Sequence, residues 1–320
     1  MRGRQLKVVI TGATGTIGMA LIRKCIEDGT QALVLVNPNS RRLSRIPNDP
    51  HIKLIKCGLE DLADADAKSL GLDKTADGEN HADAMFHLAW GGTFGDARAN
   101  KELQDKNAAY ATEAVKLAAR LGCSVFVGAG SQAEYGRVSG IISAGTPCSP
   151  ENEYGRAKLE TGIATRKLCK ELGIRHIWPR ILSIYGPFDG EKTMVMSLIA
   201  SLLKGEEPAL TKGEQMWDYL YTDDAANALM LLAKHGVDGC IYPIGSGTAR
   251  PLREYIEIIR DVIDPSLPLG FGRVPYSDKQ VMHLCADIKE LSEHTGFTPK
   301  ISFTEGAKRT VDFVRRSDNV

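Results

Sequence analysis

The sequence predicts an α/β protein with a doubly wound parallel sheet and a smaller C-terminal α+β part. Three observations carry this prediction. Short β-branched runs alternate with helical segments up to residue 181, as in parallel strands joined by crossover helices. The first run passes into a helix through a turn that contains three glycines. The 320 residues, 43% of them hydrophobic, are enough for one large domain and a smaller one.

The first element is a short buried strand, because residues 8–10 are valine, valine and isoleucine. A helix is expected at residues 19–26, where Leu21, Ile22 and Ile26 share an apolar face. The glycine turn between them suits an anion, because backbone N–H groups and the helix dipole point there and glycine admits a pyrophosphate. The alternative is a plain strand-to-helix connection. The residues predicted to hold a dinucleotide are Gly12, Thr14, Gly15, Thr16, Ile17 and Gly18.

The end of the second strand indicates which dinucleotide is bound. A fold that prefers NAD usually has Asp or Glu there, which holds the ribose 2′-hydroxyl. In this chain Val36 is followed by Asn37, and Ser40 precedes two arginines, Arg41 and Arg42. The missing carboxylate and the two arginines suit a 2′-phosphate, so NADP is favoured over NAD. The alternative is that the arginines only begin a solvated helix.

The elements up to residue 181 continue the alternation of strands and helices. His87 lies in an apolar strand, so we interpret it as a core residue rather than as a ligand or base. A glycine-rich loop at 90–96 is expected to open toward the cofactor. We expect strands at 32–36, 52–55, 84–89, 125–129 and 176–181, helices at 61–70, 99–121 and 153–172, and a polar surface loop at 71–81.

The character of the chain changes after residue 186, where glycine, proline and charged loops separate short helices. We expect residues 1–186 to form the dinucleotide-binding domain, and residues 218–248 to return to it. Residues 187–217 and 249–320 would then form a substrate-binding domain. The elements expected in this half are helices at 194–203, 225–234 and 252–263, a strand at 240–244, and a tail at 287–314.

Ser131, Tyr154 and Lys158 are the strongest catalytic candidates. The Tyr-x-x-x-Lys spacing puts both side chains on one face of a helix, one turn apart. A lysine ammonium near a phenol favours the phenolate, and a hydroxyl at the end of the fifth strand can polarise a C–O group. This arrangement suits hydride transfer at an alcohol or ketone. Tyr154 would be the acid/base, Ser131 a hydrogen-bond partner, and Lys158 would hold the nicotinamide ribose.

Taken together, these motifs occur in one order that spans most of the chain. The chain resembles the extended short-chain dehydrogenases/reductases, in particular the NAD(P)-dependent nucleotide-sugar epimerases and dehydratases. The resemblance implies a Rossmann-type fold, a tightly held cofactor along the backbone of Leu88 and Ala89, a nucleotide-diphosphate-hexose substrate, and a homodimer joined by two long helices. It also implies that Asn107 helps order the active site. The motifs are Gly12/Gly15/Gly18, His87-Leu88-Ala89, Asn107, Ser131 before Tyr135-Gly136, Tyr154 with Lys158, Arg180, Tyr185-Gly186-Pro187 and Asp223-Asp224.

Departures from the family pattern narrow the reaction. The 4,6-dehydratases follow the catalytic hydroxyl with Asp-Glu, where this chain has Gln132 and Ala133, so water elimination is not expected. The epimerase-reductase that makes a fucose nucleotide has Cys and His where this chain has Ala133 and Phe188. That chemistry is not expected either.

Two further departures concern the substrate. Where the family has an asparagine before Tyr-Gly-Pro, this chain has Ser183. Where the family often has an arginine that binds the diphosphate, this chain has Trp217. Arg273 or Arg309 is a candidate to replace that arginine. Trp217 would either stack on a base or a sugar of the substrate or simply pack within the protein. The substrate-binding residues expected are Trp90, Thr93, Gln132, Ser183, Trp217 and Arg273.

The leading hypothesis is therefore an epimerase or 4-ketoreductase that acts at a carbon, C4 by expectation, of a nucleotide-linked hexose. The first alternative is an NADPH-dependent reductase of a non-nucleotide ketone. The second is a cofactor-sensing regulator without turnover, against which the Tyr154/Lys158 pair counts.

Composition excludes several other classes. The formal net charge is zero, so nothing attracts nucleic acid or an anionic membrane in general. No apolar run reaches membrane-spanning length, and we expect no signal peptide, because the basic N-terminus leads directly into the first strand. The seven cysteines are scattered without a C-x-x-C, which indicates reduced thiols, a cytoplasmic protein and no metal site.

Overall fold

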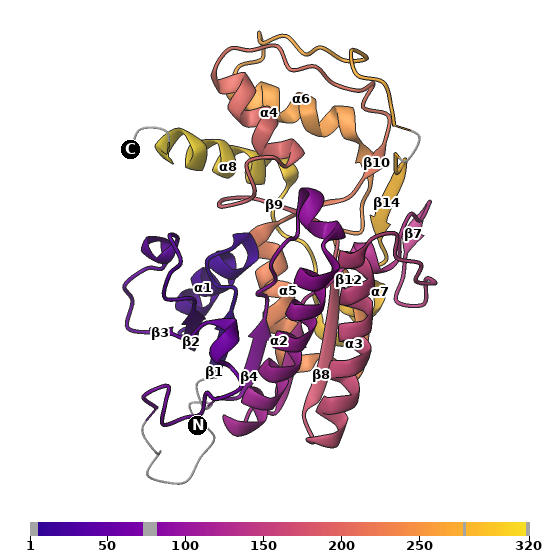
Figure 1. The fold of residues 1–320 in the computed structure, drawn as a ribbon. Helices are drawn as coiled ribbons and strands as arrows, with labels where there is room; N and C mark the ends of the chain where they lie inside the picture. Colours follow the sequence, from indigo (N-terminus) through magenta and orange to yellow (C-terminus); the bar gives the residue numbers. More distant parts are fainter. Residues whose placement is uncertain (1–5, 73–81, 278–279, 318–320) are drawn as a thin grey trace.

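Seven parallel strands form the large sheet in the computed structural model, which describes residues 6–72, 82–277 and 280–317 (Figure 1). Their order is β3-β2-β1-β4-β5-β8-β12, and the short β6 (Gly130–Ser131) pairs with β8. This is the doubly wound sheet that the sequence predicts. The strands are β1 (Lys7–Thr11), β2 (Gln31–Val36), β3 (Ile52–Lys56), β4 (Ala84–His87), β5 (Val125–Gly128), β8 (Arg175–Ile181) and β12 (Ile241–Ile244).

The strand order reverses at β1, which lies between β2 and β4. In an open α/β sheet, the crevice outside the carboxyl ends of the strands at such a reversal is the usual ligand site. Register brings the ends of β1, β4 and β5 level there, because Thr11 pairs with His87 and His87 with Gly128. The segments that leave these three ends are the ones that surround the candidate site.

Helices cover both faces of the sheet because side chains alternate along each strand. Val8 and Ile10 pack with α1 (Thr16–Glu27) and α5 (Thr222–His235) in one apolar core. Val9 points to the other face, into a core with α2 (Lys101–Arg120) and α3 (Glu153–Glu171). α2 and α3 lie side by side along that face (Figure 1).

The C-terminal part packs above the carboxyl edge of the sheet (Figure 1). Its core holds α4 (Met194–Leu203), α6 (Leu252–Ile263) and α8 (Phe303–Ser317). A small mixed sheet runs in the order β13-β10-β14-β7, and β9 pairs with β11 nearby. The remaining bounds are β7 (Ile141–Ile142), β9 (Ser183–Tyr185), β10 (Met216–Trp217), β11 (Tyr219–Tyr221), β13 (Arg250–Pro251), β14 (His283–Ala286) and α7 (Lys289–Thr295).

One predicted element is wrong. The structure has no helix at 61–70, but a 3-10 turn η2 (Leu59–Asp61) followed by further turns. The Asp61 carboxylate accepts from the Gly58 N–H, and that of Asp66 from the Ser69 N–H, so both bond locally to backbone instead of leaving it to a helix. Of the loop expected at 71–81, residues 73–81 lie outside the described residues.

The other elements agree with the prediction to within a few residues at their ends. α4 and α6 have the predicted bounds, and α1 begins three residues early at Thr16. β12 pairs parallel with β8, so the expected strand near 240–244 does join the large sheet. The division of the chain into two domains stays a prediction. Among the described residues, none of the helices combines the length and apolar character that a membrane span needs.

Candidate active site

The glycine turn after β1 contains two positions that only glycine fits. Gly12 has a φ of +75°, and a Cβ there would lie 2.5 Å from the backbone nitrogen of Ala89. A Cβ at Gly18 would lie 2.3 Å from the carbonyl oxygen of Gly12. At Gly15 the nearest atom to a Cβ would be the Gly12 carbonyl oxygen at 3.5 Å, an ordinary van der Waals contact, so the fold does not require glycine there. Packing against Leu88 and Ala89 explains Gly12, whereas the close approach of Gly12 and Ala13 within the turn explains Gly18.

The start of α1 is arranged to meet an anion. Gly15 is its N-cap residue, no side chain caps its first amides, and no acidic residue occupies its first turn. Thr16 donates its hydroxyl to the carbonyl of Phe188 at 3.1 Å, which ties the turn to the segment after β9. Uncapped amides at a helix N-terminus fit the pyrophosphate of a dinucleotide. Ile17 packs against the core.

Asn37 and Ser40, polar residues after β2, form hydrogen bonds within their own loop. The Asn37 side chain accepts from the Asn39 N–H at 2.8 Å, and the Ser40 hydroxyl accepts from the Arg42 N–H at 3.2 Å. Arg41 is exposed. The arginine that reaches the glycine turn is Arg45, which the sequence analysis did not single out.

Arg45 donates to the carbonyl of Thr14 at 3.1 Å, and its guanidinium lies 5.0 Å from the centre of the Phe188 ring. Burial and the charge of Arg42 lower the pKa of Arg45 below its ordinary value. No sequence spacing identifies this residue, because the contact depends on how the turn after Arg42 folds back.

The structure brings Ser131, Tyr154 and Lys158 together where β6 ends and α3 begins. Ser131 precedes the 3-10 turn η4 (Gln132–Glu134), and its hydroxyl accepts from the Ala133 N–H at 3.2 Å. Asn152 caps α3 by accepting from the Gly155 N–H at 2.9 Å, which fixes the turn that carries Tyr154. Tyr154 and Lys158 follow one turn apart.

Lys158 is buried, with 4% of its surface exposed. Its Nζ donates to the carbonyl of Ala129 at 2.6 Å and lies 3.7 Å from the centre of the Trp90 ring and 5.9 Å from that of Tyr154. Burial lowers the pKa of Lys158 to about 7, although the charge of Glu134 raises it in part. Burial also raises the pKa of Tyr154, which a hydrogen-bonding interaction with Ser131 and the charge of Arg98 oppose.

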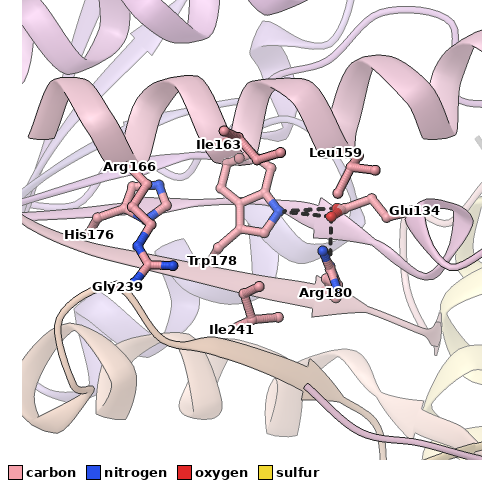
Figure 2. Close-up of a pocket in the computed structure, with 10 residues that line it drawn as sticks. Glu134, Leu159, Ile163, Arg166, His176, Trp178, Arg180, Gly239 and Ile241 are labelled. Atoms are coloured by element: carbon pink, nitrogen blue, oxygen red, sulfur yellow. Dashed lines mark hydrogen bonds and ion pairs between the residues drawn. The ribbon is translucent and has the colours of Figure 1, made fainter. Parts of the chain in front are cut away.

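A buried carboxylate, Glu134, bonds to Trp178 and Arg180 (Figure 2). It accepts from the Ser131 N–H at 2.8 Å, from Arg180 Nε at 2.6 Å, and from the Trp178 indole at 3.1 Å. A cavity of about 50 Å³ lies beside the Trp178 ring, at the α3 side of β8. Glu134 was not identified from the sequence, although the Ser-x-x-Glu spacing of a capping box marks it.

The loop after β4 is held by two buried side chains of α2. Asn107 accepts from the Gly91 N–H and donates to the Gly91 carbonyl, both at 2.9 Å. Gln104 accepts from the Trp90 indole at 2.7 Å and donates to the carbonyls of Gly92 and Ala97. The ordering of this loop by Asn107 is therefore direct, whereas Gln104 was not recognised from the sequence. Thr93 lies in the same loop, half-buried.

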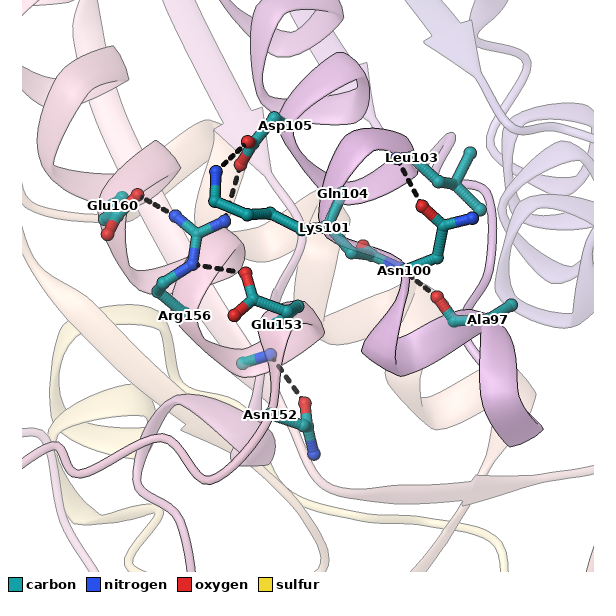
Figure 3. A network of polar contacts seen from close by, with 11 residues as sticks. Ala97, Asn100, Lys101, Leu103, Gln104, Asp105, Asn152, Glu153, Arg156 and Glu160 are labelled. Carbon is teal, nitrogen blue, oxygen red and sulfur yellow. Dashed lines mark hydrogen bonds and ion pairs between the residues drawn. The ribbon is translucent and has the colours of Figure 1, made fainter.

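Charged residues also join α2 to α3 beside the site (Figure 3). Arg156, which lies between Tyr154 and Lys158 in sequence, pairs with Asp105 on α2 at 2.5 Å. It also pairs with Glu153 at 2.7 Å and Glu160 at 2.5 Å on its own helix. Hydrogen bonds to Asp105 and Glu153 raise the pKa of Arg156 above its ordinary value.

Two of the predicted substrate-binding residues bond to each other. The Trp217 indole donates to the Ser183 hydroxyl at 2.9 Å, so the two departures from the family pattern form one pair. Arg273 pairs with Glu207 at 2.7 Å in the C-terminal part. Arg309 pairs with Glu305 at 2.8 Å and with Asp223 at 3.6 Å. The two arginines considered as substitutes for the family's diphosphate-binding arginine are therefore both paired with carboxylates.

His87 and Gln132 complete the candidate residues. His87 is buried, its Nδ1 lies 2.9 Å from the Thr11 hydroxyl, and burial lowers its pKa to about 3. A neutral, packed histidine agrees with the core interpretation. The Gln132 Oε1 atom is buried with no hydrogen-bond partner among the described residues, so an acceptor is available beside Ser131. Within the same residues, no group of three or more His, Cys, Asp or Glu is arranged to hold a metal ion.

Comparison with known proteins defines the class. The model of the NAD dependent epimerase/dehydratase family matches residues 8–245, and the chain belongs to this family. It is therefore an NAD-dependent enzyme of the nucleotide-sugar epimerase/dehydratase type, which confirms the resemblance seen in the sequence. The family description gives no support to a preference for NADP.

Individual relatives are distant. The chain is 22% identical to dTDP-glucose 4,6-dehydratase of Escherichia coli, over 98% of this chain and 94% of the relative. It is 26% identical to dTDP-6-deoxy-L-talose 4-dehydrogenase (NAD(+)) of Aggregatibacter actinomycetemcomitans, over 79% and 88%. Among solved structures, UDP-N-acetylglucosamine 4-epimerase from Methanobrevibacter ruminantium M1 aligns with a TM-score of 0.84 and 22% identity, over 98% of this chain and 99% of the other. These identities establish the fold and leave the substrate open.

Proposed function

We propose that the protein transfers hydride at a carbon, C4 by preference, of a nucleotide-diphosphate hexose, as an epimerase or a 4-ketoreductase. The observation that carries the proposal is the Tyr154–Lys158 pair beside Ser131, close to the carboxyl ends of the strands at which the glycine turn also lies. A bound nicotinamide dinucleotide supplies the hydride acceptor or donor.

The protein groups have separate tasks in this proposal. Tyr154 exchanges a proton with the substrate oxygen, and Ser131 donates a hydrogen bond to that oxygen. Lys158, fixed by the Ala129 carbonyl, would hold the nicotinamide ribose, while Ser131 and the charge of Arg98 favour the phenolate of Tyr154. The glycine turn and the uncapped start of α1 would hold the pyrophosphate.

Dehydration is not part of the proposal. Gln132 and Ala133 supply neither an acid nor a base. Glu134 is the carboxylate next in sequence, but it is fully buried and bonded to Arg180, Trp178 and the Ser131 amide. A carboxylate committed to three donors is poorly placed to move a proton on a sugar.

For the cofactor, we propose a dinucleotide in the glycine turn, with NADP still favoured by the missing carboxylate after Val36. Calorimetry with NADP and NAD tests the preference. Tighter binding of NAD, which the family description favours, would show that Arg41 and Arg42 do not serve a 2′-phosphate.

A second candidate is the reduction of a ketone without a nucleotide. The Trp217–Ser183 hydrogen bond favours it, because this pair replaces the arginine and asparagine that the family pattern places there. Arg273, a candidate to replace that arginine, is paired with Glu207.

A panel of nucleotide sugars followed by NMR, with cofactor absorbance recorded in parallel, tests both candidates. Epimers that interconvert without net cofactor use, or a keto-sugar reduced with one cofactor oxidised, support the main proposal. Tyr154→Phe should lose most turnover and still bind cofactor; near-normal turnover would remove Tyr154 from its role. Turnover of simple ketones alone supports the second candidate, and cofactor binding without turnover of any substrate supports a regulator.

A further inference from the structure

We propose that Arg98 forms an anion subsite beside Tyr154 and selects a sugar that carries a carboxylate next to the reacting carbon. The proposal rests on the proposed function, whose substrate class it makes specific. Arg98 lies in the 3-10 turn η3 (Gly95–Ala99), and its guanidinium carbon is 4.9 Å from the centre of the Tyr154 ring. It was not among the residues that the sequence pattern identified.

Among the described residues, the Arg98 guanidinium has no anionic partner. Within the described part of the chain, no carboxylate pairs with its guanidinium, and its Nε is buried without a hydrogen-bond partner. Arg156 and Arg309, by contrast, each pair with two or more carboxylates. A buried donor left unsatisfied costs free energy that an acceptor on a ligand removes.

The charges around Tyr154 also favour an anion. Arg98 and Lys158 both place positive charge beside its ring. Glu134 is the carboxylate that acts electrostatically on Tyr154 and Lys158, but it is already paired with Arg180 at 2.6 Å. The negative charge that would balance Arg98 is therefore missing from the described protein groups.

The subsite is held in place before any ligand arrives. Gln104, fully buried on α2, donates to the Ala97 carbonyl at 2.9 Å and so fixes the residue before Arg98. The Trp90 indole, bonded to the same glutamine, packs edge-on against the Tyr154 ring at 6.3 Å. A backbone fixed in this way reduces the conformational freedom that is lost when the Arg98 guanidinium binds a planar carboxylate.

The position of Arg98 favours a carboxylate on the sugar over the nucleotide diphosphate. If Tyr154 exchanges its proton with the oxygen on C4, the neighbouring carbon C5 bears the C6 group, whereas the diphosphate is attached to C1 across the ring. A uronic acid puts its carboxylate at C6. We therefore place the C6 carboxylate beside the Arg98 guanidinium, which lies over the Tyr154 ring.

The test compares UDP-glucuronate with UDP-glucose, which differ only at C6. Calorimetry on cofactor-loaded protein should show that the native chain binds the uronate more tightly. Arg98→Gln should weaken uronate binding by roughly 10- to 100-fold and change UDP-glucose binding little, as expected for loss of a charge-assisted hydrogen bond. Arg98→Lys should restore part of the affinity. Lys116→Gln, which removes one positive charge from the exposed far half of α2, is the control and should change neither affinity.

Several outcomes would overturn the assignment. Equal affinity of the native chain for both sugars, or an unchanged uronate affinity in Arg98→Gln, removes the subsite. If Arg98→Gln weakens UDP-glucose and UDP itself as much as the uronate, the guanidinium holds the diphosphate instead.

A second experiment distinguishes failure of the subsite from failure of the proposed function. Free glucuronate and glucose are titrated by saturation-transfer NMR, without a nucleotide. Glucuronate binding that Arg98→Gln abolishes supports the subsite even if no nucleotide sugar is turned over. Absence of glucuronate binding in both this experiment and calorimetry rejects it.

Discussion

Lys158 shows at the scale of one residue how burial produces chemistry. Its ammonium lies against the Trp90 ring and donates to the Ala129 carbonyl, in a site from which water is largely excluded. The charge is therefore costly, and the pKa of Lys158 falls from its ordinary value of 10.5 to about 7. A lysine that titrates near neutral pH makes both the stability and the activity of the protein depend on pH.

The first prediction concerns that dependence. Between about pH 7 and pH 10.5 the unfolded chain binds a proton at this lysine that the folded chain does not, so the free energy of unfolding rises with pH. Lys158→Met removes this contribution. Its stability relative to the native protein should be greatest below pH 7 and decrease as the pH rises. Urea denaturation without added cofactor at several pH values measures the difference, and a difference that does not vary with pH would contradict the burial argument.

The second prediction concerns Glu134. Glu134→Gln leaves the Arg180 guanidinium buried and unpaired, which costs ~3–5 kcal/mol of the free energy of unfolding. The double variant Glu134→Gln/Arg180→Met should recover part of that loss, because it removes the unpaired charge as well. Urea denaturation measures the free energies of unfolding of the two variants. If the double variant is no more stable than Glu134→Gln, the loss comes from the Ser131 amide or Trp178 instead.

At the scale of elements, the β1–α1 turn separates structural from functional glycines. Gly18 is closed in by the Gly12 carbonyl, whereas a Cβ at Gly15 would make only an ordinary van der Waals contact, at a φ that alanine adopts freely. The third prediction follows. Gly18→Ala should lower the melting temperature by several degrees, while Gly15→Ala should leave it unchanged without cofactor and weaken cofactor binding at least tenfold.

Differential scanning calorimetry and cofactor titration of the two variants test this contrast. The variants control for each other, because the same methyl group is added three residues apart on one turn. Normal cofactor affinity in Gly15→Ala would mean that the space beside Gly15 is not where the pyrophosphate lies.

At the scale of the whole molecule, α2 and α3 form one outer face. Ile163 on α3 is 65% exposed, and it also lines the cavity beside Trp178. The fourth prediction is that this face joins two copies of the chain. Ile163→Arg should convert a dimer to a monomer, whereas Ile141→Arg, equally exposed on β7, should not.

Light scattering after size-exclusion chromatography gives the mass of each species. A native protein with the mass of one chain would reject the dimer, and dissociation by both variants would show that the α2–α3 face is not specific. The activity of the monomeric variant then shows whether the site needs its partner.

How far the sequence predicts this protein depends on the range of the interactions involved. Strands such as β1 and helices such as α4 were predicted because apolar periodicity is local. The false helix at 61–70 arose because Asp61 and Asp66 bond to nearby backbone, which periodicity does not register. Ser131 and Tyr154 were predicted to lie together because Ser131 follows the end of a strand and Tyr154 lies at the start of a helix, at the same edge of the sheet.

The sequence by itself determined the order of strands and helices, the glycine turn and the family, since these depend on short motifs and their spacing. Only the tertiary structure decided that Arg45 rather than Arg41 reaches the glycine turn, that Ser183 and Trp217 bond to each other, and that Arg98 stands unpaired over Tyr154. The reason is physical. These contacts join residues on different loops and strands, and the energies that choose a partner for a guanidinium or an indole depend on burial, which no spacing along the chain records.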